Sequence, residues 1–323
     1  MQDRAQVAIN RKSAVKLPVT MTYLLKEIWK YRLSYLFIAP FVSMFVIFTI
    51  IPVAAAIGLS FTYFNAIEPP DWTGWLNYQN LLSQDLIFLE KVLPNTFKYA
   101  LFVGPLGYVM AFLLAWLIAQ LPSAPRLGYT LAMYAPSLTA GIAMGVIWQV
   151  MFSGDRSGYI NSFLLNWGYI DKPILFVTDK DYLLNIMIIV SIWASMGVGF
   201  LAILAGILNV DKQLYEAARI DGMKSRLQEI WYITIPMMRP QMLFAAILAL
   251  THTLKSGDIG VQLSSQNPTP GYAGQLMLNH VQDYGFIRYE LGYACAVSVV
   301  MLLLMIIISK ACFSLFGTKE DNE

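Results

Sequence analysis

Six long apolar runs, separated by polar segments, dominate the hydrophobic pattern of the chain. They cover residues 36–61, 99–121, 127–152, 183–208, 240 to about 257, and 291–316. Roughly 20 helical residues are enough to cross the hydrocarbon core of a bilayer. The pattern therefore predicts an all-α, polytopic membrane protein with six transmembrane helices. The fifth run is the weakest, because it carries Thr251, His252 and Lys255.

The composition excludes an ordinary soluble protein. Of the 323 residues, 57% are hydrophobic and only 13% are charged, whereas soluble domains average about a quarter charged residues. The net charge of +2 indicates no nucleic-acid partner. Cys295 and Cys312 belong to one apolar run and would lie about 25 Å apart along a helix, so they are not expected to form a disulfide.

Basic residues predict the orientation, because Lys and Arg concentrate in cytoplasmic segments. With six spans and a cytoplasmic N-terminus, 15 basic residues lie on the cytoplasmic side and six on the other. Both termini are therefore expected in the cytoplasm, in a multi-pass protein of the cell membrane. Residues 1–35 form the expected N-terminal segment, where Met21, Leu24, Leu25 and Ile28 have the spacing of an amphipathic helix on membrane lipid. Residues 36–323 form the expected transmembrane domain.

A polar segment of about 30 residues, 209–239, separates the fourth and fifth runs and is predicted to lie in the cytoplasm. Asp211 is a candidate helix cap, and Gly222 can adopt the positive φ that ends a helix. A second short stripe follows at Leu227, Ile230 and Trp231. This pattern predicts a helix, a glycine turn and a second helix. Charges of both signs, Glu229 among them, favour equally a docking site for another protein and a solvated loop on lipid headgroups.

The same segment carries a motif of specific spacing. Glu216-Ala217-Ala218, then Gly222, and then Ile233-Thr-Ile-Pro236 resemble the EAA signature of permease subunits of binding-protein-dependent ATP-binding-cassette importers. The stretch 214–222 is similar to the form of the carbohydrate-uptake branch, and residues 35–40, 95–96 and 291–294 resemble the same family. Two features depart from it: the interval from Gly222 to Pro236 is one residue longer than expected, and residues 264–271 replace a glycine-rich stretch.

The resemblance implies a function in transport. The chain would form half of the translocation pathway for a sugar or oligosaccharide, beside a second, non-identical permease and with an extracytoplasmic binding protein. Two cytoplasmic ATPase subunits would bind ATP and Mg²⁺ and dock on a coupling helix. The residues expected to make that contact are Glu216, Ala217, Ala218, Arg219, Asp221 and Gly222. The chain itself has no phosphate-binding G-x-x-x-x-G-K-[ST] motif, so it is expected to bind no cofactor and to hydrolyse no ATP.

Ionisable residues inside a membrane span are candidates for function, because burying them in lipid is costly. Thr251, Lys255 and Asp258 would share one face of a continuous helix, with His252 beside them. Two interpretations have equal weight: a polar lining of the substrate pathway, or a Lys255–Asp258 pair that reaches toward the outer surface. The acids of the outer loops, which include Asp85, likewise fit either a docking surface for the binding protein or ordinary solvated surface.

Other classes of function have weaker support. His252 and His280 lie on different segments, there is no H-E-x-x-H, and the cysteines lack metal-ligand spacing, so no catalytic residue and no metal site are expected. A membrane-embedded enzyme is therefore disfavoured. The main alternative is a secondary transporter or channel that acts without an ATPase partner.

Overall fold

The computed structural model describes residues 29–139 and 141–316. The amphipathic helix predicted around residues 21–28 lies outside these residues. Contacts divide the chain into two units, 1–55 and 56–323, which are described separately. The expected domain boundary at residue 35/36 stays a prediction.

One long apolar helix forms the described part of the first unit and continues into the second. It consists of α3 (Arg32–Phe45), a π-helical turn, η1 (Val46–Ile50), and α4 (Ile51–Leu59). The most apolar 18-residue window of this 28-residue helix has a mean hydropathy of 2.5, and no residue of that window is buried. A helix with apolar side chains all around is suited to a surrounding of lipid or of other helices.

The second unit contains the other apolar helices. They are α6 (Leu93–Ala119), α7 (Ser123–Leu138), α8 (Gly141–Met151), α10 (Leu183–Ala194), α11 (Val198–Leu208), α15 (Arg239–Leu254) and α18 (Leu291–Phe316). By length and composition, the described residues contain three helices that could cross a membrane, or up to six if each bent pair is one span. The all-α, polytopic prediction is confirmed.

Two predicted spans are broken, not continuous. The run 127–152 is interrupted after α7, where Thr139 adopts an extended conformation, and α7 and the following helix are bent by 99°. The run 183–208 is interrupted at Ser195–Gly197 with a bend of 42°. The Ser195 hydroxyl donates to the Ile192 carbonyl there at 2.6 Å. Such breaks are tolerated in membranes where side chains and neighbouring helices satisfy the freed backbone groups.

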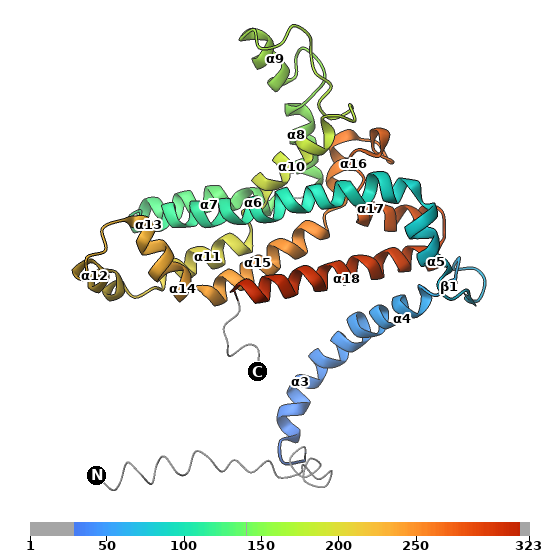
Figure 1. Cartoon of the computed structure of the whole chain (residues 1–323), viewed down its shortest axis with the longest axis horizontal. Helices are drawn as coiled ribbons and strands as arrows, with labels where there is room; N and C mark the ends of the chain where they lie inside the picture. The colour runs from blue at the N-terminus through green and yellow to red at the C-terminus, as the bar shows by residue number, and fades with distance from the viewer. Residues whose placement is uncertain (1–28, 140, 317–323) are drawn as a thin grey trace. The chain divides into compact units, whose positions relative to one another are not determined.

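Four helices lie side by side in the centre of the second unit: α6, α11, α15 and α18 (Figure 1). Small residues allow close packing between them. A Cβ atom added at Gly199 of α11 would lie 3.5 Å from Ala245 of α15, and small residues at helix contacts let backbones approach closely in membranes. The apolar core between α6, α11 and α15 includes Ala115, Phe200 and Ile203.

Short elements connect the spans. Their bounds are β1 (Thr62–Tyr63), β2 (Asp71–Trp72), α5 (Leu76–Gln79), η2 (Asn80–Gln84), η3 (Phe88–Val92), α9 (Tyr159–Asn166), α12 (Lys212–Ile220), α13 (Arg226–Glu229), η4 (Ile230–Thr234), α14 (Ile235–Met237), α16 (Asp258–Ser264), η5 (Pro270–Tyr272), α17 (Met277–Gln282) and η6 (Asp283–Ile287). Strands β1 and β2 pair antiparallel, with Thr62 opposite Trp72. A separate apolar core, including Phe88, Met277 and Val297, joins η3, α17 and α18.

Candidate functional site

The first half of the segment 209–239 folds as its local sequence predicts. The Asp211 carboxylate caps α12 by accepting a hydrogen bond from the Gln213 backbone N–H at 2.9 Å. Helix α12 ends at Ile220, and Gly222 follows with a φ of +95°. This backbone conformation is unfavourable for residues with a Cβ atom, whereas glycine, which has none, adopts it readily.

The six residues predicted to contact an ATPase are brought together on this helix and its C-terminal turn. All are exposed except Ala218, which is half-buried, and no residue of α12 is buried. Apolar side chains of the segment are also exposed to an unusual extent: Ile220 is 87% exposed and Trp231 67%. The segment therefore presents a surface on which a partner protein could bury apolar area.

In the second half of the segment, a helix begins at an N-terminal cap and is longer than the short helix predicted from the apolar stripe. The Ser225 hydroxyl accepts from the Leu227 N–H, and the Gln228 side chain accepts from the Lys224 and Ser225 N–H groups. Helix then runs through α13, η4 and α14, past Pro236. Its axis meets that of α15 at 82°.

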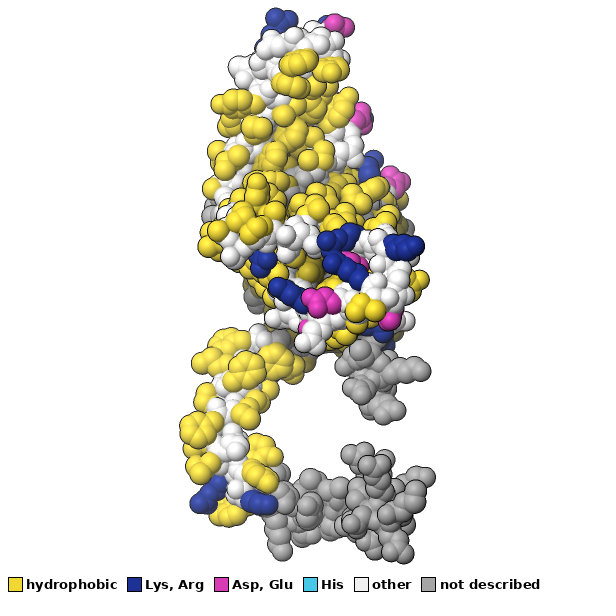
Figure 2. Space-filling view, turned by 90° about the vertical axis from the view of Figure 1, so that its left-hand side faces the viewer, with side chains coloured by type: hydrophobic (Ala, Val, Ile, Leu, Met, Phe, Trp, Pro, Cys, Tyr) yellow, Lys and Arg dark blue, Asp and Glu magenta, His cyan; other side chains and the backbone are white. Residues whose placement is uncertain are grey.

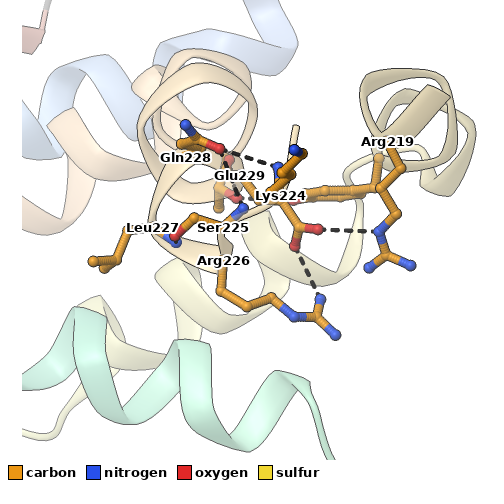
Figure 3. Close-up of polar contacts among 9 residues, drawn as sticks. Arg219, Lys224, Ser225, Arg226, Leu227, Gln228 and Glu229 are labelled. Carbon is orange, nitrogen blue, oxygen red and sulfur yellow. Dashed lines mark hydrogen bonds and ion pairs between the residues drawn. The ribbon is translucent and has the colours of Figure 1, made fainter. Parts of the chain in front are cut away.

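The sequence analysis counted Glu229 among the charges of this segment but assigned it no contact and no role. Its side chain is 11% exposed and accepts from Arg219 at 3.2 Å and from Arg226 at 2.9 Å (Figure 3). A further hydrogen bond of 2.9 Å joins the Tyr215 and Thr234 hydroxyls. These contacts tie α12 to the second helix across the Gly222 turn, so the two helices are held at a defined angle.

The surface around these contacts is rich in basic side chains. Figure 2 looks onto the end of the second unit that carries α12 and α13, where Lys and Arg side chains gather with acidic and hydrophobic side chains among them. Lys212, Lys224 and Arg226 of the segment are all exposed. Because charge of both signs lies beside apolar area, the surface is suited to selective protein contact.

A cavity of about 620 Å³ lies between the helices of the second unit. Helices α6, α7, α8, α10, α11, α15 and α16 contribute to its walls. Thr251, His252 and Lys255 line it, as the sequence analysis expected of a substrate pathway, whereas Asp258 is not among the described lining residues. Its volume is in the range of small-molecule binding sites.

The expected single helical face from Thr251 to Asp258 is wrong. Helix α15 ends at Leu254 with Lys255 at its C-cap, and Asp258 begins α16 after Gly257. Within residues 29–139 and 141–316, Lys255 and Asp258 form no ion pair. The break follows from Gly257, whose φ of −134° and ψ of −40° leave the helical region.

A second polar cluster, absent from the sequence predictions, is centred on Asp85 between η2 and η3. Its Oδ2 accepts from Tyr293 at 2.7 Å and from Tyr284 at 3.2 Å, and lies 2.9 Å from Nε2 of His280; Oδ1 accepts from the Phe88 N–H at 2.8 Å. The Asp85 side chain is only 8% exposed. Asp85 is therefore buried among η2, η3, α17 and α18, and both interpretations of it from the sequence, a docking surface and ordinary solvated surface, are wrong.

The hydrogen bonds of this cluster set the charge state of Asp85. Burial acts to raise the pKa of the carboxyl group. The hydrogen bonds from His280, the Phe88 N–H and Tyr293 outweigh burial, and the pKa lies well below its usual value. Burial also raises the pKa of Tyr284, with a smaller contribution from the Asp85 charge, to about 12. The cluster thus holds an ionised carboxylate surrounded by neutral tyrosines.

Comparison with known proteins agrees with the motif. Residues 104–316 match the family described as binding-protein-dependent transport system inner membrane component. The chain is 30% identical over 281 residues to the probable ABC transporter permease protein YesP of Bacillus subtilis (strain 168), covering 87% of this chain and 89% of that protein. It is 28% identical over 287 residues to the arabinooligosaccharides transport system permease protein AraP of the same organism, covering 88% of each.

The fold agrees as well. A solved bacterial ABC transporter involved in the import of the acidic polysaccharide alginate contains a chain of the same fold, with a TM-score of 0.74 and 25% identity, covering 90% of this chain and 97% of that one. The predicted family resemblance is thereby confirmed. The chain belongs to the family of binding-protein-dependent transport system inner membrane components, as a multi-pass permease of a sugar or oligosaccharide ABC importer.

Proposed function

We propose that this permease is driven by separate cytoplasmic ATPase subunits that dock on α12 and the Gly222 turn. The observation that carries the proposal is the exposed helix α12, tied across a glycine turn by Glu229 to a helix that leads into α15. Helix α15 lines the cavity. A partner that moves α12 would therefore act on the cavity wall through the second helix, which Glu229 ties to α12 and which meets α15 at a bend of 82°.

The remaining partners complete the proposed transporter. A second, homologous permease supplies the other half of the pathway, and an extracytoplasmic binding protein delivers the saccharide. A solved bacterial alginate ABC transporter in complex with an alginate pentasaccharide-bound periplasmic protein has the fold of this chain, with a TM-score of 0.75. The partner ATPases bind ATP and Mg²⁺, and this chain binds no cofactor of its own.

Co-purification tests the assembly. When the tagged permease is extracted from its native membrane in a mild detergent, an ATPase and a second permease are expected to purify with it at fixed stoichiometry, as measured by mass spectrometry of the intact complex. Glu229→Gln weakens the contacts that hold α12 and is expected to reduce ATPase recovery, while the exposed control Glu90→Gln is not. Solute transport by the purified chain alone would contradict the proposal and favour a secondary transporter or channel.

The proposed topology places both termini and α12 in the cytoplasm, with residues 62–98 and 153–182 outside. Ser83 and Lys224 are exposed, and the proposed topology places them on opposite sides of the membrane. In a background with Cys295→Ser and Cys312→Ser, an impermeant maleimide added to intact spheroplasts is expected to label Ser83→Cys and not Lys224→Cys. After lysis both should react. Labelling of the two positions from the same side would overturn the topology.

A further inference from the structure

The cavity between the helices has a charge that the proposed function does not explain. Among its described lining residues Lys255 and His252 are basic, and none is acidic. Both side chains are exposed. The remaining polar lining consists of hydroxyl groups and one amide, that of Gln262.

Three hydroxyl groups of the cavity wall, those of Thr251, Ser256 and Ser137, already donate their protons to backbone carbonyls nearby in the chain. Thr251 donates to the Ile247 carbonyl at 2.8 Å, Ser256 to the His252 carbonyl at 2.9 Å, and Ser137 to the Tyr134 carbonyl at 2.8 Å. What these side chains still offer are oxygen lone pairs, which accept hydrogen bonds. Such acceptors suit the hydroxyl groups of a sugar, but they cannot stabilise an anion.

Lys255 adds an ammonium group to a wall whose other polar groups are mainly hydroxyls. In the described part of the chain no carboxylate lies within ion-pair distance of its ammonium group. The C-terminal end of α15, which Lys255 caps, contributes a partial negative charge of about half an elementary charge. That is about half of the charge needed to neutralise the ammonium group, so Lys255 can still pair with an anionic partner.

We infer that the saccharide carried through this cavity is acidic, and that its carboxylate pairs with the ammonium group of Lys255 while neutral hydroxyls donate to the surrounding serine and threonine oxygens. The inference rests on the proposed function, since it takes the cavity as part of the translocation pathway. The inference specifies the charge of the substrate and identifies Lys255 as the residue that recognises it.

Transport of one saccharide in charged and uncharged form tests the inference. The complete complex with its binding protein is reconstituted in liposomes, and ATP-driven uptake is measured for trigalacturonate and for its fully methyl-esterified form. Lys255→Gln is expected to lower kcat/KM for trigalacturonate about tenfold, the scale of one lost charge-assisted hydrogen bond. For the ester the change should stay within about twofold, and Lys255→Arg should retain most uptake of the acid.

The binding protein is the same in every measurement, so the difference between variants reports on the permease alone. Lys91→Gln, at an exposed lysine in η3 away from the cavity, is the matched control and should change neither rate. Equal losses for the acid and the ester would overturn the inference and indicate that Lys255 pairs with an acid of the second permease. Uptake of maltotriose but not of trigalacturonate would also overturn it. Uptake of any saccharide without ATP would contradict the proposed function instead.

Discussion

Replacing Gly222 with alanine is expected to reduce ATP-driven uptake about tenfold while leaving membrane insertion intact. A Cβ at this position would meet no atom within 4 Å, so the substitution causes no clash inside the chain. The cost is conformational: φ is +95°, and a side chain in the left-handed region costs about 1–2 kcal/mol. The turn would relax toward another conformation, and α12 would lose its angle to the second helix. The measurement is ATPase activity and uptake in reconstituted complexes.

Gly168 supplies the matched control for this prediction. It also has a positive φ, +71°, with no atom within 4 Å of a built Cβ, but it lies between the third and fourth spans. Gly168→Ala carries a comparable backbone cost and is expected to leave coupling unchanged. Gly222→Asn should be milder, because asparagine tolerates positive φ better. Glu216→Lys reverses an exposed charge on α12 and should also uncouple hydrolysis from uptake; undiminished uptake by both Gly222→Ala and Glu216→Lys would refute the coupling role.

Asp85→Asn is expected to lower the free energy of unfolding of the segments around η2, η3 and α17 by about 2–4 kcal/mol. In the native protein one oxygen of Asp85 accepts from two tyrosines and lies beside His280, while the other accepts from a backbone N–H. An amide nitrogen cannot accept any of these hydrogen bonds, so at least one buried donor is left unpaired. The effect is measured as the apparent Tm of the purified complex, with the rate of proteolysis within η2, η3 and α17 as the readout of unfolding.

The stability that Asp85 contributes is expected to depend on pH. Because the folded pKa of Asp85 lies below its ordinary value of 3.8, its contribution to stability is complete well above pH 3.8. It is lost as the pH falls toward the folded pKa. The difference in apparent Tm between the native protein and Asp85→Asn should therefore be largest near neutral pH and shrink below about pH 4. A constant difference from pH 7 to pH 3 would contradict an ionised Asp85, and the exposed control Glu90→Gln should show no difference.

Local signals in the sequence proved sufficient for local structure. The run 291–316 coincides with α18, and the Asp211 cap and the Gly222 turn depend on residues within a few positions of one another. The breaks in the third and fourth spans were not predictable from hydropathy, because an apolar run has the same pattern whether its helix is straight or bent.

The contacts that sequence reasoning missed are those that join distant positions. Glu229 has the i,i+3 spacing to Arg226, but its contact with Arg219 spans ten residues and depends on the turn between them. His280 lies 195 residues from Asp85. Sequence periodicity cannot predict a contact over such a distance. The sequence therefore did not distinguish Asp85, which is buried where η3 packs against α17, from the exposed acids of the same loops.

Because the second helix of the segment 209–239 meets α15 at 82°, a small rotation at this bend produces a much larger displacement at the far end of α15. Helix α15 has 16 residues and is therefore about 24 Å long. A tilt of about 10° at the bend would swing its far end, where Lys255 sits, through about 4 Å, more than the length of a hydrogen bond. A small displacement at α12 is thus enough to make or break contact between the cavity wall and a bound saccharide.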